Sequence, residues 1–292
     1  MISRRKMIQS AAGVGAMAAT GNLLLGQEKP KAQGKMNEPS NGQAGIRQSA
    51  CQWCFKSWDQ ATFCTNAKKL GLVGIDLVGP DWFDALKKHG LIGTMTPSHG
   101  ITKGLNRKEN WDECLGKIRA SIESTSDAGF PNVICFSGNR AGMDDEEGLK
   151  NCAEALKQVV GLAEEKKVTI CMELLSSKRN HKDYMCDRTA WGAKLVDTVG
   201  SDRFKLLYDI YHMQVDEGDV IATLTEFKDR IGHYHTAGVP GRNEIDESQE
   251  LFYPAIMRAI ASTGFKGVVA QEFIPKREPY ASLEQAVQIC NV

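Results

Sequence analysis

The sequence has no excess of charge of either sign and no long apolar run after its N-terminal segment. Its 292 residues carry 36 Lys and Arg against 36 Asp and Glu, so the chain lacks the positive charge that binding to nucleic acid or to an anionic membrane requires. Beyond the extreme N-terminus, no apolar run approaches the roughly 20 residues that a membrane-spanning helix needs. We therefore expect a soluble globular protein that does not bind nucleic acid and whose mature chain does not insert stably into a membrane.

Two kinds of motif are also missing. No GxGxxG or GxxxxGK[ST] motif follows the first apolar run, so the usual nucleotide-binding signature of a doubly wound sheet is absent. The nine cysteines are odd in number and scattered through apolar segments, and the pair Cys51 and Cys54 has no second CxxC partner. We therefore expect thiols in the core rather than disulfides or a structural zinc site.

The first 45 residues differ in composition from the rest of the chain. Arg4 and Arg5 precede an Ala- and Gly-rich stretch, residues 7–25, that has no acidic residue. Paired arginines before such a stretch are typical of a twin-arginine export signal, and residues 26–44 have the composition of a flexible linker. We predict a signal and linker over residues 1–45, a periplasmic location, and one folded domain over residues 46–292. A cytoplasmic location follows if the segment is not a signal.

After the linker, short apolar runs alternate with longer amphipathic stretches. Strand–helix repeats of this kind indicate parallel βαβ units, and eight of them in about 250 residues is the number that closes a (β/α)8 barrel. We predict an α/β fold with a single (β/α)8 TIM barrel, and a doubly wound open sheet is the alternative. The expected strands cover residues 48–55, 73–78, 92–98, 132–136, 168–174, 205–209, 231–236 and 267–273, and the expected helices cover residues 58–70, 82–89, 108–128, 145–166, 187–199, 219–227 and 249–262.

The last four expected strands each end in an acidic residue or a histidine, namely Glu173, Asp209, His235 and Glu272. Active sites of such barrels lie at the carboxyl ends of the strands, so these side chains are expected to converge. Buried carboxylates need a cationic partner, and three carboxylates with one imidazole suit Mn²⁺ or Mg²⁺ better than a structural zinc. One divalent ion is the predicted cofactor, and an ion-pair network without metal is the alternative.

Two of these residues also suit proton transfer. Glu173 and Glu272 come from the fifth and eighth strands and so approach the site from different sides. A metal that binds the carbonyl and hydroxyl oxygens of an α-hydroxycarbonyl compound acidifies the C–H bond between them. A carboxylate on each side could remove and return that proton through an enediolate, so we expect Glu173 and Glu272 to be the catalytic bases.

Other polar residues flank the predicted site. We expect His212 to hydrogen-bond a substrate oxygen and Arg242 to bind a carboxylate or hydroxyls with two N–H groups. A helix-capping histidine and a solvated arginine are the alternatives. His99 follows the third strand and is expected to line the pocket and to bind the substrate. His181 is a candidate lid residue and Trp53 a candidate wall residue.

Four segments carry the motifs of a known family: residues 104–110 (GLNRKEN), 184–192 (YMCDRTAWG), 204–214 (FKLLYDIYHMQ) and 240–244 (PGRNE). Through them the sequence resembles the hydroxypyruvate isomerase family of the xylose-isomerase-like TIM barrel superfamily. The resemblance implies a metal-dependent aldose–ketose isomerase that converts hydroxypyruvate to tartronate semialdehyde, or acts on a similar small sugar or sugar acid. It implies metal ligands Glu173, Asp209, His235 and Glu272, bases Glu173 and Glu272, and substrate contacts from His212 and Arg242.

Other functions stay open at this point. That family usually has Gln where His235 stands, whereas ketose 3-epimerases have His, so a ketose 3-epimerase is the main alternative. A non-catalytic carbohydrate-binding barrel is another. A metal-dependent nuclease would need more histidines than six and a basic surface. The expected partner is a small sugar or hydroxy-keto acid, and the sequence leaves homo-oligomer formation undecided.

Overall fold

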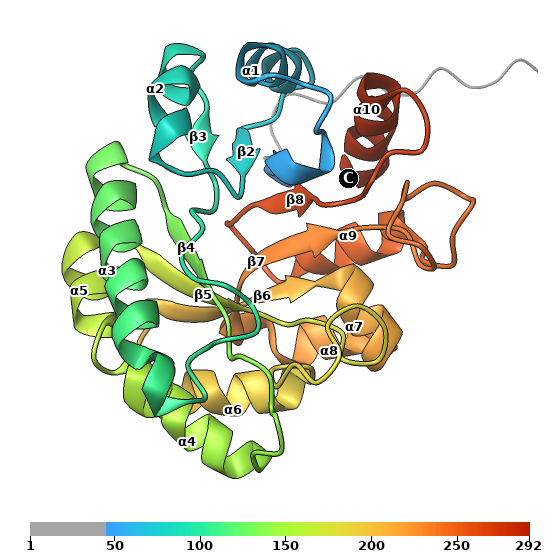
Figure 1. The fold of residues 1–292 in the computed structure, drawn as a ribbon. Coiled ribbons are helices and arrows are strands. Elements are labelled where there is room, and N and C mark those ends of the chain that lie inside the picture. The colour runs from blue at the N-terminus through green and yellow to red at the C-terminus, as the bar shows by residue number, and fades with distance from the viewer. Residues whose placement is uncertain (1–44) are drawn as a thin grey trace, which may run out of the picture. The chain divides into compact units, whose positions relative to one another are not determined.

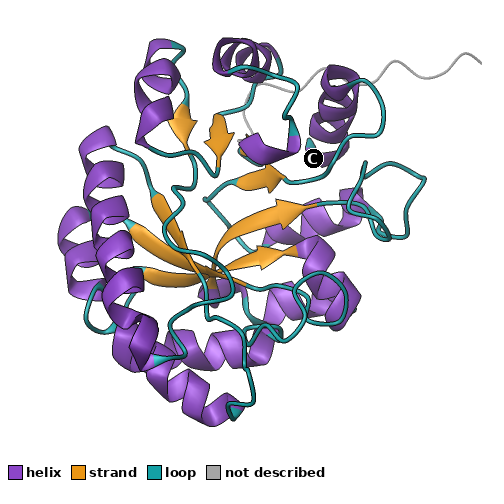
Figure 2. Ribbon diagram, viewed as in Figure 1, coloured by secondary structure: helices purple, strands orange, loops and turns teal. Residues whose placement is uncertain are grey.

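The computed structural model describes residues 45–292, so the predicted export signal and nearly all of the linker lie outside the described residues. Eight parallel strands form one sheet in the order β3-β2-β1-β8-β7-β6-β5-β4 (Figure 1). Thr96, just after β3, makes a parallel bridge to Val133 of β4 and so joins the two ends of the sheet. The helices lie outside the strands (Figure 2). The predicted TIM barrel is confirmed, and the open doubly wound sheet is not the fold.

Each strand overlaps one of the eight expected runs, and most are shorter than the run, although β6 begins one residue earlier, at Phe204. The first run, for example, leaves the sheet after Cys51 and continues as the 3-10 helix η1 (Gln52–Cys54). The strands are β1 (Gln48–Cys51), β2 (Gly74–Asp76), β3 (Ile92–Gly93), β4 (Asn132–Cys135), β5 (Thr169–Glu173), β6 (Phe204–Asp209), β7 (Ile231–Thr236) and β8 (Val269–Gln271).

The helices depart from the expectation at three places. The stretch expected as one helix is two, α4 and α5, separated by residues 157–159, which contain no glycine or proline that would signal the break. Two helices were not expected, α7 and α10. The helices are α1 (Gln60–Lys69), α2 (Pro80–Lys88), α3 (Trp111–Ala128), α4 (Asp145–Leu156), α5 (Val160–Lys166), α6 (Thr189–Val199), α7 (Ile210–Asp216), α8 (Val220–Glu226), α9 (Tyr253–Ser262) and α10 (Pro279–Cys290), with 3-10 helices η2 (Lys108–Asn110) and η3 (Lys228–Arg230).

Local capping explains the two unexpected helices. Asp209 ends β6 in an extended conformation, and its carboxylate accepts a hydrogen bond from the backbone N–H of His212, which begins α7 directly at the strand end. Glu278 accepts from the N–H groups of Tyr280 and Ala281, and Pro279 occupies the first position of α10. The helix α7 follows β6 with no loop between them, whereas residues 272–278 separate β8 from α10.

The core lies between the strands and the helices and inside the barrel. All residues of β4 and the last four residues of β5, β6 and β7 are buried. All nine cysteines are buried and free, as expected for thiols that act as small core residues. Among the described helices, none is both long enough and apolar enough to cross a membrane.

Candidate active site

The structure brings the four polar strand-end residues together. Glu173 ends β5, Asp209 ends β6, His235 lies in β7 and Glu272 follows β8 directly. Asp209 and His235 are register partners of neighbouring strands. One ligand atom from each of the four side chains lies within 4.8 Å of the others, and all four residues are buried.

Glu272 has several partners in this cluster. One of its oxygens, Oε2, is 2.9 Å from His235 Nδ1 and 2.5 Å from Arg242 Nη2. The other, Oε1, accepts a hydrogen bond of 2.8 Å from the indole N–H of Trp53. Burial opposes ionisation of Glu272, but the charges of Arg242 and His235 outweigh it and hold its pKa well below its ordinary value. Glu272 is therefore a carboxylate.

Glu173 and Asp209 are less well compensated. Oε1 of Glu173 and Oδ2 of Asp209 are buried and have no hydrogen-bond partner. Burial raises the pKa of both carboxyl groups, and the nearby charge of Glu272 adds to the effect. The cationic groups nearest to these two oxygens are farther away than those around Glu272. Nδ1 of His235 is 3.4 Å from Oε1 of Glu173, and Nη2 of Arg242 is 3.5 Å from Oδ2 of Asp209. Each orphaned oxygen is an acceptor that lacks a cation or a donor.

This donor set fits a divalent cation. Three carboxylates and one imidazole each offer a ligand atom that lies within 4.8 Å of the other three, and two of the carboxylate oxygens have no hydrogen-bond partner. A divalent ion among them would satisfy both oxygens and offset the repulsion between three buried carboxylates. The four residues could therefore hold a metal ion.

His212 and Arg242, predicted as substrate contacts, border the cluster. His212 is fully buried, and both of its ring nitrogens lack a hydrogen-bond partner. Burial, helped by the positive charge of Arg242, lowers its pKa well below the ordinary value, so the ring is neutral. Its Nε2 is 3.7 Å from Oδ2 of Asp209. The ring therefore offers an uncharged nitrogen beside the cluster.

Arg242 is not a solvated side chain. Its backbone is in the left-handed region, with φ 60°, and its side chain is 13% exposed. The guanidinium lies 5.1 Å from the ring centroid of Trp53 and 5.6 Å from that of Tyr211. Its Nε has no hydrogen-bond partner. One N–H of Arg242 is therefore left for a ligand after the ion pair to Glu272 is made.

His99 lies apart from the cluster. Its Nδ1 is 3.0 Å from the carbonyl oxygen of Gly100, and its Nε2 is 3.4 Å from the backbone nitrogen of Phe136. Its ring packs edge-on against that of Phe136. Both nitrogens are occupied by backbone groups, so a direct substrate contact by His99 stays a prediction that requires these hydrogen bonds to change.

A cavity of about 410 Å³ opens beside the cluster, and its lining is divided in two. The side formed after β2, β3 and β4 is apolar, whereas the ionic groups come from β5 and from the segments after β7 and β8. His181 and Trp53, expected as lid and wall, are both in the lining. The lining residues are Trp53, Leu77, Pro97, Ile101, Ile134, Phe136, Glu173, Leu175, His181, Arg242 and Glu272.

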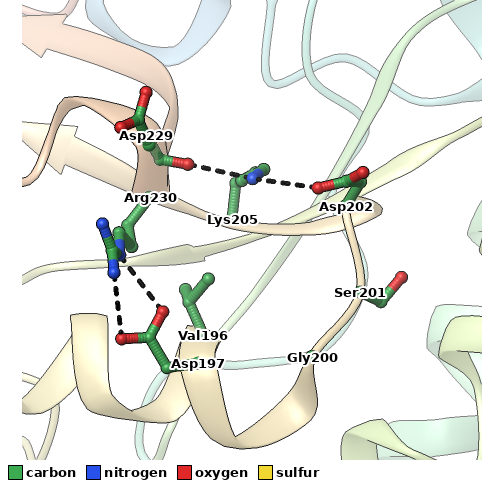
Figure 3. Close-up of a pocket in the computed structure, with 8 residues that line it drawn as sticks. All are labelled: Val196, Asp197, Gly200, Ser201, Asp202, Lys205, Asp229 and Arg230. Carbon is green, nitrogen blue, oxygen red and sulfur yellow. Dashed lines mark hydrogen bonds and ion pairs between the residues drawn. The ribbon is translucent and has the colours of Figure 1, made fainter.

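A second hollow lies at the opposite end of the strands, between the end of α6 and the start of β6. Its two basic side chains, Arg230 and Lys205, both bind acidic residues of the same hollow (Figure 3). Arg230 binds both carboxylate oxygens of Asp197, and Lys205 donates to the carbonyl of Asp229 and lies 3.7 Å from Asp202. These groups satisfy each other, and active sites of such barrels lie at the other end of the strands.

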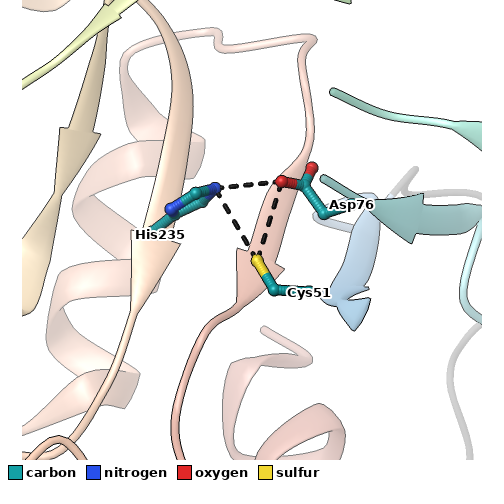
Figure 4. A group of neighbouring side chains, drawn as sticks. All are labelled: Cys51, Asp76 and His235. Atoms are coloured by element: carbon teal, nitrogen blue, oxygen red, sulfur yellow. Dashed lines mark hydrogen bonds and ion pairs between the residues drawn. The ribbon is translucent and has the colours of Figure 1, made fainter. Parts of the chain in front are cut away.

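Asp76 is a site residue that the sequence reasoning missed. It ends β2 and is fully buried, with Oδ1 3.1 Å from His235 Nε2 and 3.6 Å from the sulfur of Cys51 (Figure 4). Its Oδ2 is 2.9 Å from His233 Nε2. Burial opposes ionisation, but the two histidines outweigh it and lower the pKa of Asp76. A carboxylate at the end of an apolar run was the available signal, as it was for Glu173.

The chain is similar to several known proteins. The family model described as xylose isomerase-like TIM barrel matches residues 80–289. Hydroxypyruvate isomerase of Escherichia coli is 29% identical over 176 residues, which cover 59% of this chain and 66% of that protein. D-psicose 3-epimerase of Ruminiclostridium cellulolyticum is 26% identical over 134 residues, which cover 44% and 43%. The matched part is thus less than two thirds of either relative's length.

Solved structures have the same fold. The crystal structure of a family 2 AP endonuclease from Brucella melitensis superposes with a TM-score of 0.73 and 19% identity, over 82% of this chain and 97% of that one. At this level of identity the likeness shows the barrel and not the chemistry.

Proposed function

The chain belongs to the xylose isomerase-like TIM barrel family, and from this premise we propose that it is a metal-dependent aldose–ketose isomerase of a small α-hydroxycarbonyl compound such as hydroxypyruvate. The observation that carries the proposal is the buried cluster of Glu173, Asp209, His235 and Glu272, in which two carboxylate oxygens have no partner. Similarity to a protein named hydroxypyruvate isomerase supports the substrate class.

The cofactor in this proposal is one Mn²⁺ or Mg²⁺ held by the four cluster residues, because carboxylate oxygens with one imidazole suit these ions. When bound, the ion polarises the carbonyl and hydroxyl oxygens of the substrate and acidifies the C–H bond between them. The remaining chemistry belongs to the side chains around it.

Glu173 and Glu272 carry the proton in this scheme. Both line the cavity, so both reach a bound ligand. With hydroxypyruvate, one carboxylate removes a proton from C3, the hydroxyl proton moves to the oxygen on C2, and a proton returns to C2 to give tartronate semialdehyde. Burial raises the pKa of Glu173, which brings this carboxyl group closer to the range in which it can both accept and return a proton at neutral pH. Arg242, through its unpaired Nε, and neutral His212 orient the substrate oxygens.

The divided lining of the cavity favours a short substrate. The charged side chains of the lining come from the side of β5 to β8, and the indole N–H of Trp53 already donates to Glu272. The side chains of Leu77, Ile101 and Ile134 on the other side cannot hydrogen-bond the hydroxyls of a long sugar. A compound with all its oxygens at one end satisfies this arrangement without leaving polar groups buried against an apolar wall.

A ketose 3-epimerase is the second candidate. It would use the same two glutamates, with proton return to the carbon from which the proton came but on the opposite face. The size of the cavity, about 410 Å³, favours it, because a three-carbon acid fills only a fraction of that volume. The sequence match to a D-psicose 3-epimerase supports it as well.

A substrate panel tests the proposal. The full chain, loaded with Mn²⁺, is incubated separately with hydroxypyruvate, with four- and five-carbon ketoses and with D-fructose. The products are identified by NMR. Tartronate semialdehyde from hydroxypyruvate supports the isomerase, and a C3 epimer from a ketose supports the alternative. Glu173→Gln and Glu272→Gln should abolish either product, whereas Glu147→Gln, on the exposed face of α4, should not. No product from any compound, with metal bound, would leave a non-catalytic carbohydrate-binding barrel.

A further inference from the structure

One buried carboxylate beside the cluster has no task in the proposed reaction. Asp76 is fully buried and is not among the residues that line the cavity, and no step of the proposed reaction uses it. Its strand, β2, lies on the far side of β1 and β8 from β7, yet its Oδ1 reaches across to Nε2 of His235 at 3.1 Å (Figure 4). A charged group buried in this way is costly unless neighbouring groups pair with it, and the two histidines and Thr94 supply that pairing.

The two nitrogens of the His235 ring face different groups. Nδ1 faces the cluster, 2.9 Å from Glu272 and 3.4 Å from Glu173. Nε2 faces away from it, toward Asp76. A histidine that binds a metal through one nitrogen commonly donates the other N–H to a carboxylate, which fixes the tautomer and the ring orientation.

We propose that Asp76 is the positioning residue of the metal centre: it keeps a proton on Nε2 of His235 and thereby presents Nδ1 to a divalent ion held with Glu173, Asp209 and Glu272. The inference rests on the metal site of the proposed function. It adds a residue of β2 to a site that is otherwise built from β5 to β8.

Asp76 is itself held in place. Thr94 donates a hydrogen bond of 2.5 Å to its Oδ2, and His233 lies 2.9 Å from the same oxygen. Oδ1 is thus left for His235, with the thiol of Cys51 as a longer contact of 3.6 Å. A carboxylate with one oxygen fixed by two neighbours can point the other in only one direction, which is what an orienting residue needs.

The same atoms allow a competing arrangement, in which Cys51, Asp76 and the Nε2 of His235 bind an ion themselves. That arrangement provides three ligands and would take Nε2 from its hydrogen bond. It depends on the sulfur of Cys51, whereas the orienting role does not. Cys51→Ser therefore separates the two and serves as the matched control, because it alters a neighbour of Asp76 and His235 without removing their contact.

Metal affinity is the first readout. Binding of Mn²⁺ to the full chain is measured by the EPR signal of the free ion for the wild type, Asp76→Ala and Cys51→Ser. Asp76→Ala removes the acceptor of the His235 N–H and should raise the Kd by about 10- to 100-fold, the usual effect of removing the partner of a metal-binding histidine. Cys51→Ser should leave the Kd within about twofold of the wild-type value. Equal affinity in Asp76→Ala, or an equal loss in Cys51→Ser, would overturn the inference.

The tautomer of His235 is the second readout. It is measured on the wild-type protein, so the result does not depend on whether a variant folds. In the wild-type protein loaded with diamagnetic Mg²⁺, ¹⁵N NMR of the imidazole should show a proton on Nε2, hydrogen-bonded and slow to exchange, and none on Nδ1. A proton on Nδ1 would refute the proposal. If the metal-loaded protein converts no substrate at all, the proposed isomerase fails, while these two measurements still decide the role of Asp76.

Discussion

Removing the guanidinium of Arg242 should weaken the fold of the metal-free protein but not its hold on a metal. In Arg242→Met, Glu272 loses an ion pair of 2.5 Å and Asp209 one of 3.5 Å, both in a site where the arginine side chain is only 13% exposed. Breaking a buried ion pair by removing one partner costs about 3–5 kcal/mol. In a domain of this size, about 3 kcal/mol corresponds to a fall of about 6–12 °C in Tm.

Metal should reverse most of that loss. A divalent ion replaces the missing positive charge between Glu272 and Asp209, and the site without Arg242 is more negative than before. We therefore expect Arg242→Met to bind Mn²⁺ at least as tightly as the wild type, while its kcat/KM falls about 10²-fold because the substrate contact is lost. Calorimetry of both proteins, with EDTA and with excess Mn²⁺, measures the two effects. A variant whose Tm in EDTA equals that of the wild type would refute the assigned ion pairs, and one that no longer binds Mn²⁺ would refute the charge argument.

Further predictions concern the bases, the metal and the thiols. Glu173→Gln and Glu272→Gln should each lower the rate of substrate proton exchange by about 10²- to 10⁴-fold, with Glu147→Gln unchanged as the control. Saturating Mn²⁺ at about 1,000 times its Kd should stabilise the fold by about 4 kcal/mol relative to EDTA, seen as a rise in Tm, and no rise would contradict a native metal site. Burial raises the pKa of Cys171 and of Cys290 to about 12, so at pH 8 about one thiol in 10⁴ is ionised at each, and Ellman's reagent should find them only after unfolding. Since the unfolded chain ionises these thiols first, they stabilise the fold fully below about pH 9, and that contribution is lost as the pH rises toward 12; denaturant titrations between pH 8 and 11 check the sign.

The barrel could be predicted from the sequence because short apolar runs alternate with amphipathic helical stretches along the chain. The helical details could not. Residues 157–159 contain no breaking residue, yet they separate α4 from α5. The helix α7 begins at Asp209 itself, so a residue expected only as a ligand also caps a helix. Such effects come from contacts between elements and leave no periodic signal.

Part of the candidate site could be predicted from the sequence because the order of the strands places its residues. Glu173, Asp209, His235 and Glu272 lie at or within one residue of the carboxyl ends of four consecutive strands, so their convergence follows from the barrel alone. Asp76 carries an equal signal, but its use depends on which nitrogen of His235 points across the barrel, and no spacing in the sequence encodes that. The loop conformation that brings Arg242 over Trp53 is likewise set by a left-handed backbone that the sequence pattern does not reveal.

Deuterium incorporation tests the central claim most directly. The Mn²⁺-loaded full chain is incubated with hydroxypyruvate in D₂O, and the position of deuterium is read by NMR in substrate and product. The account predicts deuterium at C3 of hydroxypyruvate and at C2 of tartronate semialdehyde, lost when either Glu173 or Glu272 is replaced by Gln. Product formed without deuterium at these carbons, or at an undiminished rate in both variants, would contradict proton transfer by the two glutamates.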